Sequence, residues 1–309
     1  MEKLKAIFVV GPTASGKTAL GIEIAKKFGG EVISADSMQI YKGIHIASAA
    51  PDSEEMQGIP HHLIEFLDTS EQFSVADYVA AARLKIKEIS DRKKLPVIVG
   101  GTGLYISALL DNTEFINEQT DLELRKELEN RFDTVGAEKM LEELSTFDPE
   151  TAKRLHPNDR RRIIRAFEVY KTTGKSITWQ NENSHSGESE ISSLVIGITY
   201  ENREKLYERI NKRVDLMLAN GLLQEAQTAF ERADSSGGFQ AIGHKELYGY
   251  LKGESSLEES VDFLKMQTRR YAKRQLTWFR RDERINWLYA DKDNVIALAE
   301  ELVENFVKE

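Results

Sequence analysis

Apolar and polar positions alternate in blocks through the first third of the chain. Three short, mostly apolar runs have the length of strands buried on both faces: Ala6–Val10, Glu31–Ala35 and Pro96–Val99. Helical spacing of apolar residues follows over Ala19–Phe28 and over Ser74–Ile89, and the second of these segments opens with a Ser-x-x-Asp capping pattern. This alternation predicts an α/β fold built on a doubly wound parallel sheet.

The pattern changes after about residue 115. Charged helices dominate from Asn117 to Thr178, and a polar segment, Asn181–Ser193, has the composition of a loop or linker. A buried-strand pattern returns at Ser193–Thr199, which we expect to be the last strand, and helices continue almost to the end with breaks at Gly221 and around Ser235–Gly238. We therefore predict a core formed by residues 1–115 and 193–309, with a helical insertion domain at residues 116–192.

The first strand leads into the segment GPTASGKT, which fits the phosphate-binding loop pattern G-x-x-x-x-G-K-[ST]. Glycines let successive backbone N–H groups surround phosphate oxygens, Lys17 adds a positive charge, and the Thr18 hydroxyl can hold Mg²⁺. The alternative is a chance glycine-rich turn, and the flanking strand and helix argue against it. The predicted diphosphate-binding residues are Gly11, Pro12, Thr13, Ala14, Ser15, Gly16, Lys17 and Thr18. The motif does not specify the reaction.

Asp36 follows the second predicted strand. If that strand lies beside the first, Asp36 faces the bound phosphates and can take a proton from an attacking nucleophile. A turn or helix-cap role is the structural alternative, because Asp-Ser is favoured in both. The Pro96–Val99 strand ends in Gly-Gly-Thr rather than in an acidic residue, which lowers the expectation of an ATPase motor or a GTPase switch.

Two further sets of side chains have possible roles in chemistry. The helix predicted at Leu206–Leu218 carries Arg209 and Arg213 one turn apart, and such an arginine can bind a diphosphate bidentately, although either alone is more often a surface ion-pair former. The adjacent His61 and His62 would point to opposite faces of a strand, so a zinc site is not expected.

Composition narrows the class of protein. The 309-residue chain has a net charge of −9 and no cysteine, which excludes disulfides, thiolate zinc sites and cysteine nucleophiles. No apolar run approaches the roughly 20 residues of a membrane span, and we expect a cytoplasmic protein. Two segments are nevertheless basic: Lys153–Lys175 and Lys265–Arg284 each hold eight Lys or Arg against two acidic residues. Such segments are typical either of phosphate-backbone contact or of a solvated helix face.

Taken in order, these motifs resemble the tRNA dimethylallyltransferase (isopentenyltransferase) family over nearly the whole chain. The matching segments are GPTASGKT from Gly11, EVISADSMQIY from Glu31, IPHHLI from Ile59, FSVADY from Phe73, VGGTGLY from Val99, RRRIIRAFEVY from Arg160, INKRVDLML from Ile210, QAIGHKEL from Gln240 and TRRYAKRQLTWFRR from Thr268. The phosphate-binding motif alone is not specific, whereas the ordered set is.

The resemblance implies transfer of a dimethylallyl group from dimethylallyl diphosphate to the exocyclic amine of the adenosine 3′ of the anticodon in tRNA, with Mg²⁺ as cofactor. By matched position, Thr13 to Thr18 would hold the diphosphate, with Lys17 and Thr18 in the catalytic set and Thr18 at the metal. Asp36 would be the general base and Arg213 would help neutralise the leaving group. We expect a monomer.

The same resemblance implies a tRNA-facing set: Asp36, Ser37, Met38, Gln39, Thr102, Arg160, Arg161, Arg162, Ile163, Ile164, Gln240, Ala241, Ile242, Gly243, His244 and Lys245. The helical insertion would grip the anticodon stem. Two positions depart from the family pattern, with Ala50 where relatives usually carry lysine and His244 where they usually carry tyrosine. Both departures concern peripheral RNA contact rather than the chemistry.

Two other functions remain open at this stage. A P-loop small-molecule kinase would use the insertion as a lid and Arg160 to Arg162 as phosphate clamps, but it leaves the second basic segment unexplained. A nucleotide-gated RNA-binding protein would need a metal-organising acidic residue that the motifs do not supply.

Overall fold

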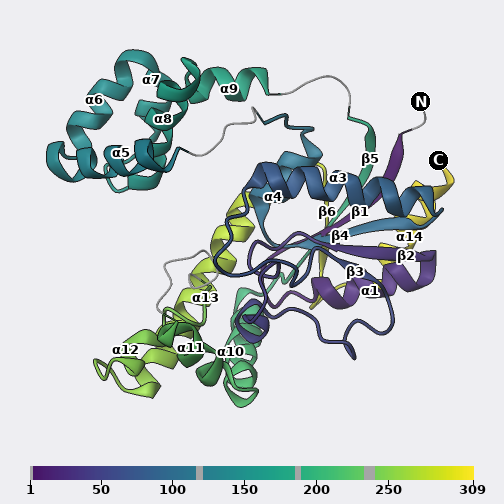
Figure 1. Ribbon diagram of the computed structural model, residues 1–309. Coiled ribbons are helices and arrows are strands. Elements are labelled where there is room, and N and C mark those ends of the chain that lie inside the picture. Colours follow the sequence, from purple (N-terminus) through teal and green to yellow (C-terminus); the bar gives the residue numbers. More distant parts are fainter. Residues whose placement is uncertain (1–2, 116–120, 185–188, 233–240) are drawn as a thin grey trace. The chain divides into compact units, whose positions relative to one another are not determined.

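The structure, a computed structural model, describes residues 3–115, 121–184, 189–232 and 241–309 (Figure 1). The chain forms two compact units. The core unit joins Met1–Leu110 to Ser189–Glu309, and the insertion unit is Asp111–Glu188. Within the described ranges, no helix is both long enough and apolar enough to cross a membrane.

The core unit is built on one six-stranded sheet in which every pair of neighbouring strands is parallel. The strands are β1 (Leu4–Val10), β2 (Gly30–Ser34), β3 (His61–His62), β4 (Leu95–Gly100), β5 (Ile191–Thr199) and β6 (Ile285–Tyr289). Their order is β3-β2-β4-β1-β5-β6, so the α/β class is confirmed. The second strand does not lie beside the first, which was the condition given for Asp36 to face the phosphates, because β4 lies between them.

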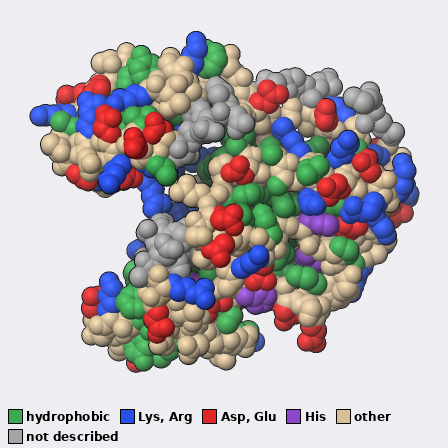
Figure 2. Space-filling model, viewed as in Figure 1, with side chains coloured by type: hydrophobic (Ala, Val, Ile, Leu, Met, Phe, Trp, Pro, Cys, Tyr) green, Lys and Arg blue, Asp and Glu red, His purple; other side chains and the backbone are tan. Residues whose placement is uncertain are grey.

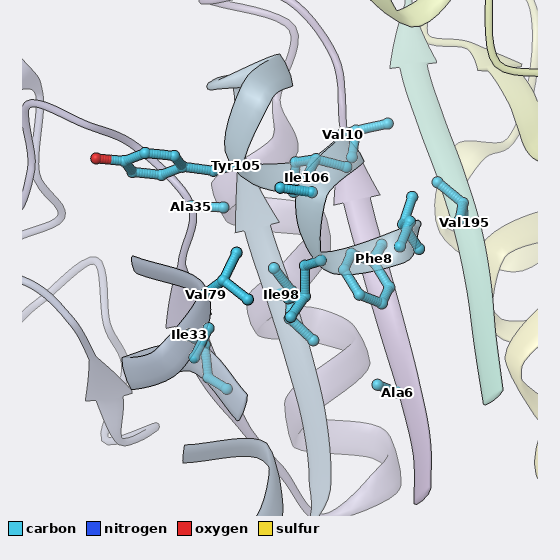
Figure 3. Packing of buried hydrophobic residues seen from close by; sticks show 14 of the residues in the cluster. Ala6, Phe8, Val10, Ile33, Ala35, Val79, Ile98, Tyr105, Ile106 and Val195 are labelled. Atoms are coloured by element: carbon cyan, nitrogen blue, oxygen red, sulfur yellow. The ribbon is translucent and has the colours of Figure 1, made fainter. Parts of the chain in front are cut away.

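Helices cover both faces of this sheet (Figure 1). On one face, α1 (Lys17–Phe28) and α14 (Val295–Lys308) pack on the side chains of Ile7 and Val9. On the other face, α3 (Val75–Asp91) and α4 (Gly103–Leu110) cover Phe8. Figure 3 shows the second of these layers, in which side chains from β1, β2, β4 and β5 pack together beneath the helices. Because all the strands run in parallel, their carboxyl ends meet at one edge of this buried sheet.

The starts of two helices follow from local sequence. α3 begins at Ser74, whose hydroxyl accepts from the Asp77 N–H while the Asp77 carboxylate accepts from the Ser74 N–H, so the predicted capping box is confirmed. α1 begins after Gly16 instead, which has φ 102° and provides no side-chain cap, and no acidic residue stands in its first turn. The N-terminal N–H groups of α1 are thus left to other partners.

A group of helices completes the core unit beyond the carboxyl ends of the strands: α2 (His45–Ser48), α10 (Arg203–Ala219), α11 (Leu222–Glu231), α12 (Tyr248–Leu251) and α13 (Leu257–Phe279). Leu206, Ile210 and Val214 form a buried stripe on α10, whereas Leu218 at the same spacing is only partly buried. β6 was missed by sequence reasoning, which expected helices almost to the end. The predicted break around Ser235–Gly238 lies outside the described residues.

The insertion unit contains five helices in its described part: α5 (Leu122–Val135), α6 (Ala137–Phe147), α7 (Pro149–Arg154), α8 (Arg160–Thr173) and α9 (Ile177–Asn183). Leu128, Met140 and Phe167 lie at the centre of its own apolar core. Basic and acidic side chains are mixed on the face of this unit that Figure 2 shows. The polar segment predicted from Asn181 begins later than expected, because α9 continues to Asn183.

Candidate active site

A cavity of about 330 Å³ lies at the carboxyl edge of the sheet. Its wall combines the loop between β1 and α1, the segment after β2, and side chains from α10 and α13. The polar and charged members are Thr13, Lys17, Thr18, Ser34, Asp36, Ser37, Gln39, Ser48, His61, Arg213, Lys245, Thr268, Tyr271, Arg274 and Gln275. The structure thus brings Lys17, Thr18, Asp36 and Arg213, which were singled out separately along the chain, into one cavity.

The Gly11–Thr18 loop has the backbone conformation of a tight turn. Gly11 has φ 145°, and a Cβ on it would lie 2.2 Å from the carbonyl oxygen of Ile198, so no other residue fits there. Ser15 Oγ is buried and has no hydrogen-bond partner among the described residues. The loop ends at the uncapped start of α1. The N–H groups of the first turn of α1, the Ser15 hydroxyl and the positive end of the helix dipole together favour an anion.

Side chains from two helices, α13 and α10, bond to the backbone of this loop. Gln275 of α13 accepts a hydrogen bond from the Thr13 N–H at 2.8 Å and donates one to the Gly101 carbonyl oxygen at 3.0 Å. A Cβ at Gly101 would lie 2.2 Å from Gln275 Nε2, which explains the glycine. Arg209 of α10 donates from Nε to the Ala14 carbonyl oxygen at 3.0 Å. Arg209 therefore positions the loop.

Positive groups inside the cavity are poorly solvated. Lys17 Nζ donates to the Pro12 carbonyl oxygen at 2.7 Å. Burial, as the largest cause, and the Arg213 charge together lower the pKa of Lys17 to about 7, although Asp36 opposes the shift. Burial also lowers the pKa of Arg213. Both cations would gain a strong partner if a phosphate group entered the cavity, because desolvated charges interact strongly with an opposite charge.

Asp36 lies in a turn and lines the cavity at the same time. Its Oδ1 accepts from the Met38 N–H at 2.9 Å, which is the turn contact expected of the structural alternative. Thr102, just beyond β4, accepts from the Ser37 N–H at 2.9 Å and ties the two strand ends together. The turn fixes the carboxylate at the cavity wall, so the structural and chemical roles are compatible.

Sequence reasoning did not place four polar or charged side chains of α13 in the cavity: Thr268, Tyr271, Arg274 and Gln275. Thr268, Tyr271 and Gln275 occur at helical spacing, and Gln275 is only 6% exposed. Burial raises the pKa of Tyr271, and the neighbouring Asp36 raises it further. The missed signal was this polar stripe within the basic segment Lys265–Arg284, because polar residues on the buried face of a long helix require a partner.

The predicted tRNA-facing residues of the insertion unit fall into two groups. Ile163 and Ile164 are 0% and 5% exposed and belong to the core of that unit, so their side chains do not face a partner. Arg161 and Arg162 are exposed. Arg160 forms an ion pair with Asp133, which offsets part of its charge.

The predicted set at residues 240–245 is divided in the same way. Gln240 lies outside the described residues. Ala241 and His244 are buried at 1% and 0% exposure, whereas Ile242, Gly243 and Lys245 line the cavity. Direct contact of the His244 side chain with RNA is therefore corrected to an internal role, since its Nε2 lies 2.8 Å from Glu225 Oε1.

The two adjacent histidines have different partners. His62 Nε2 lies 2.7 Å from Glu31 Oε2, which also accepts from Arg92. The His61 Nδ1 contacts the Ile59 carbonyl oxygen at 2.8 Å. Among the described residues there is no group of three or more side chains able to hold a metal ion on their own.

A magnesium ion is compatible with this cavity. Mg²⁺ prefers oxygen ligands, keeps several waters and is usually held by one or two protein oxygens together with substrate phosphates. The Thr18 hydroxyl lines the cavity at the start of α1 and can supply one such oxygen. The remaining ligands would come from a bound diphosphate and water.

Comparison with known proteins identifies relatives over nearly the full length of the chain. The IPP transferase family model matches residues 39–282. A tRNA dimethylallyltransferase from Caldanaerobacter subterraneus subsp. tengcongensis is 46% identical over 305 residues, covering 98% of this chain and 96% of the relative. The tRNA dimethylallyltransferase of Bacillus subtilis is 46% identical over 286 residues, covering 92% and 90%.

Solved structures agree with the sequence comparison. The tRNA isopentenylpyrophosphate transferase of Bacillus halodurans matches with a TM-score of 0.72 at 43% identity, covering 99% of this chain and 96% of that one. A eukaryotic dimethylallyltransferase, solved while acting on tRNA, matches with a TM-score of 0.79 at 30% identity, covering 97% and 80%. On these matches, the chain belongs to the IPP transferase family.

Proposed function

We propose that this enzyme transfers a dimethylallyl group from dimethylallyl diphosphate to the exocyclic amine of the adenosine 3′ of the anticodon in tRNA. The amine nitrogen forms a bond to the allylic carbon, the bond from that carbon to the diphosphate oxygen breaks, and the nitrogen loses a proton. The products are isopentenyladenosine and diphosphate. Because tRNA is the acceptor, we place the activity in the cytoplasm, and a monomer remains our prediction.

The observation that carries this proposal is the joint placement of the Gly11–Thr18 loop and Asp36 in one cavity. The diphosphate would occupy the loop, with Lys17 and Arg213 at the oxygens that gain negative charge as the allylic bond breaks. Preorganised positive groups at a developing charge favour the transition state over the bound substrate. Apolar lining from Val99, Met217 and Leu264 suits a short hydrocarbon chain.

Asp36 would accept the proton released by the amine. Its carboxylate lines the same cavity and is held by the turn at Met38, so it needs little reorganisation to act. The adenine must leave the anticodon-loop stack to reach this depth, which requires contacts elsewhere to hold the RNA backbone. We assign those contacts to Arg161, Arg162 and Lys245.

Magnesium would be held by Thr18 and the diphosphate oxygens. When bound there, it would supply additional positive charge at the leaving group. Thr18 lies in the first turn of α1, directly after Lys17, and lines the cavity. The kinase alternative is not favoured, because the relatives over nearly the whole chain are dimethylallyltransferases.

A label-transfer experiment tests the proposal. The parent protein, with Mg²⁺, is incubated with unmodified tRNA and dimethylallyl diphosphate labelled in the allyl group, and label in the RNA is measured over time. We expect transfer by the parent and roughly 10²- to 10⁴-fold slower transfer by Asp36→Asn, which keeps the shape but cannot take the proton. The exposed Asp52→Asn is the matched control. Equal rates for Asp36→Asn and the parent would remove Asp36 from the mechanism.

A further inference from the structure

Glu225, near the start of α11, links two parts of the core unit through one carboxylate. Its Oε2 accepts from the Ile46 N–H at 2.8 Å, and its Oε1 accepts from the Ala47 N–H at 2.9 Å. These are N–H groups of the first turn of α2, which has no side-chain cap of its own at Ile44. Oε1 also lies 2.8 Å from His244 Nε2. One carboxylate thus satisfies donors from two separate segments.

The contact is buried and charge-assisted. The Glu225 side chain is 12% exposed and His244 is fully buried. Burial by itself would raise the pKa of Glu225, but the His244 contact and the two backbone N–H groups outweigh it and lower the pKa. Glu225 is therefore ionised at neutral pH and can only accept, which places the hydrogen on His244 Nε2. Hydrogen bonds to an ionised group are among the stronger ones in proteins.

Apolar packing supports the same junction. Ile46 and Ala47 of α2 pack in a cluster with Leu222 and Ala226 of α11. A Cβ on Gly243, whose φ is 122°, would lie 3.3 Å from the Ala47 Cβ, so the turn after residue 240 approaches α2 closely. α2 is consequently held by α11 and by this turn.

α2 in turn shapes the part of the cavity next to Asp36. Ala47, Ser48 and Ala49 line the cavity. Gln39 Nε2 donates to the Ala49 carbonyl oxygen at 3.1 Å, and Gln39 Oε1 accepts from Ser34 Oγ at 2.8 Å. Gln39 therefore links α2 to the segment after β2 that carries Asp36, so a shift of α2 would move this segment.

The diphosphate side of the cavity is held by other residues. The Gly11–Thr18 loop is bonded to Gln275 of α13 and Arg209 of α10, and neither belongs to the Glu225 junction. The two sides of the cavity therefore have separate supports, which allows one to be disturbed with little effect on the other.

We propose that Glu225 is a positioning residue for the acceptor side of the transfer cavity, acting through α2 and Gln39. The inference rests on the proposed function in that the acceptor is the adenosine of an RNA. Loss of the carboxylate frees α2, widens the range of positions of Gln39 and weakens productive binding of the RNA, while the diphosphate subsite keeps its shape.

Glu225→Gln is the main variant, because it keeps the size of the side chain and removes the charge. Glu231→Gln is the matched control on the same helix, since Glu231 is exposed and its carboxylate contacts only Gln227 in the described part of the chain. Steady-state transfer is measured with dimethylallyl diphosphate and an anticodon stem-loop RNA, each varied in turn. We expect Glu225→Gln to raise the KM for RNA about tenfold and to leave the KM for dimethylallyl diphosphate within about twofold.

A reciprocal variant and a structural readout complete the test. Gln275→Ala should raise the KM for dimethylallyl diphosphate more than that for RNA. Hydrogen exchange of the backbone at residues 44–50 should become faster in Glu225→Gln than in the parent. His244→Phe, which removes one donor and leaves both backbone bonds, should raise the KM for RNA in the same direction by about two- to threefold.

Equal increases in both KM values, or an RNA KM within twofold of the parent together with unchanged exchange at residues 44–50, would overturn the proposal. If Glu225→Gln does not fold, a parent-like RNA KM in His244→Phe would do the same. A parent protein that transfers nothing would instead refute the proposed function, so the two failures are distinguishable.

Discussion

Lys17→Met should abolish transfer and at the same time stabilise the fold. The parent places an ammonium group in a cavity that lowers its pKa from 10.5 to about 7, with burial as the largest cause and Arg213 as the next. A lowered lysine pKa means that the folded state disfavours the charged form. Methionine has a similar length but no charge, so it avoids this cost. The substitution also removes the ammonium group that would contact the leaving diphosphate, so transfer should stop.

The size of the stabilisation follows from proton linkage. Below pH 7 the lysine is protonated in both states, so the folded state carries the full cost of the shift. Between pH 7 and 10.5 the unfolded chain holds the proton more tightly than the folded protein does, so the free-energy cost to folding falls as the pH rises. This cost is roughly 4 kcal/mol at pH 7 and about 2 kcal/mol at pH 9. Loss of the bond to the Pro12 carbonyl oxygen offsets part of this, so we expect a net gain of about 2–4 kcal/mol at pH 7.

Urea unfolding measures the difference in free energy of unfolding between the parent and Lys17→Met. It is carried out at several pH values from 7 to 10, without phosphate in the buffer. Other titrating groups are common to both proteins and cancel in the comparison. The gain should shrink steadily with rising pH, and inorganic diphosphate should stabilise the parent more than the variant. A variant less stable than the parent at pH 7, or a difference that does not change with pH, would refute the reasoning.

Three further predictions concern the reaction and the RNA. Thr18→Ala should require roughly tenfold more Mg²⁺ for half-maximal transfer, which a magnesium titration measures; an unchanged requirement would exclude the Thr18 hydroxyl as a metal ligand. Replacing Arg161 and Arg162 together by alanine should make the log–log salt dependence of tRNA affinity shallower by about two units, whereas Lys126→Ala, on α5 of the same unit, should change it little. A fluorinated allylic diphosphate should bind with near-normal affinity but react much more slowly, as single-turnover rates would reveal, and parent-like rates would argue against positive charge on the allylic carbon.

Periodicity and local motifs were sufficient to predict most of the core. Buried strands such as β1 and β4 read as continuous apolar runs, and the capping box at Ser74 fixed the start of α3. β6 was missed because its five residues form neither a continuous buried run nor a regular alternation and follow a charged segment, so that only pairing with β5 identifies it as a strand. The strand order also depends on pairing between distant segments, which local pattern does not encode.

The residues of the candidate site also divide into those that a local motif predicts and those that depend on long-range contacts. Lys17, Thr18 and Asp36 could be predicted, because each occupies a motif next to a strand end, where side chains of a parallel sheet gather. Gln275 and Glu225 could not, because each acts by bonding to backbone groups more than a hundred residues away. Their roles depend on how α11 and α13 pack. The polar stripe of α13 indicates that Gln275 has a partner but not which one, and Glu225 carries no comparable local signal.

The most direct test of the central claim is mass analysis of the nucleosides of unmodified tRNA after incubation with this protein, Mg²⁺ and either dimethylallyl diphosphate or ATP. With dimethylallyl diphosphate, we expect one adenosine per modified tRNA, the one 3′ of the anticodon, to gain the mass of a dimethylallyl group, with release of diphosphate. With ATP we expect no change in the RNA. Unmodified adenosine in the first reaction, together with phosphate release from ATP in the second, would contradict the account and favour a kinase or a nucleotide-driven switch.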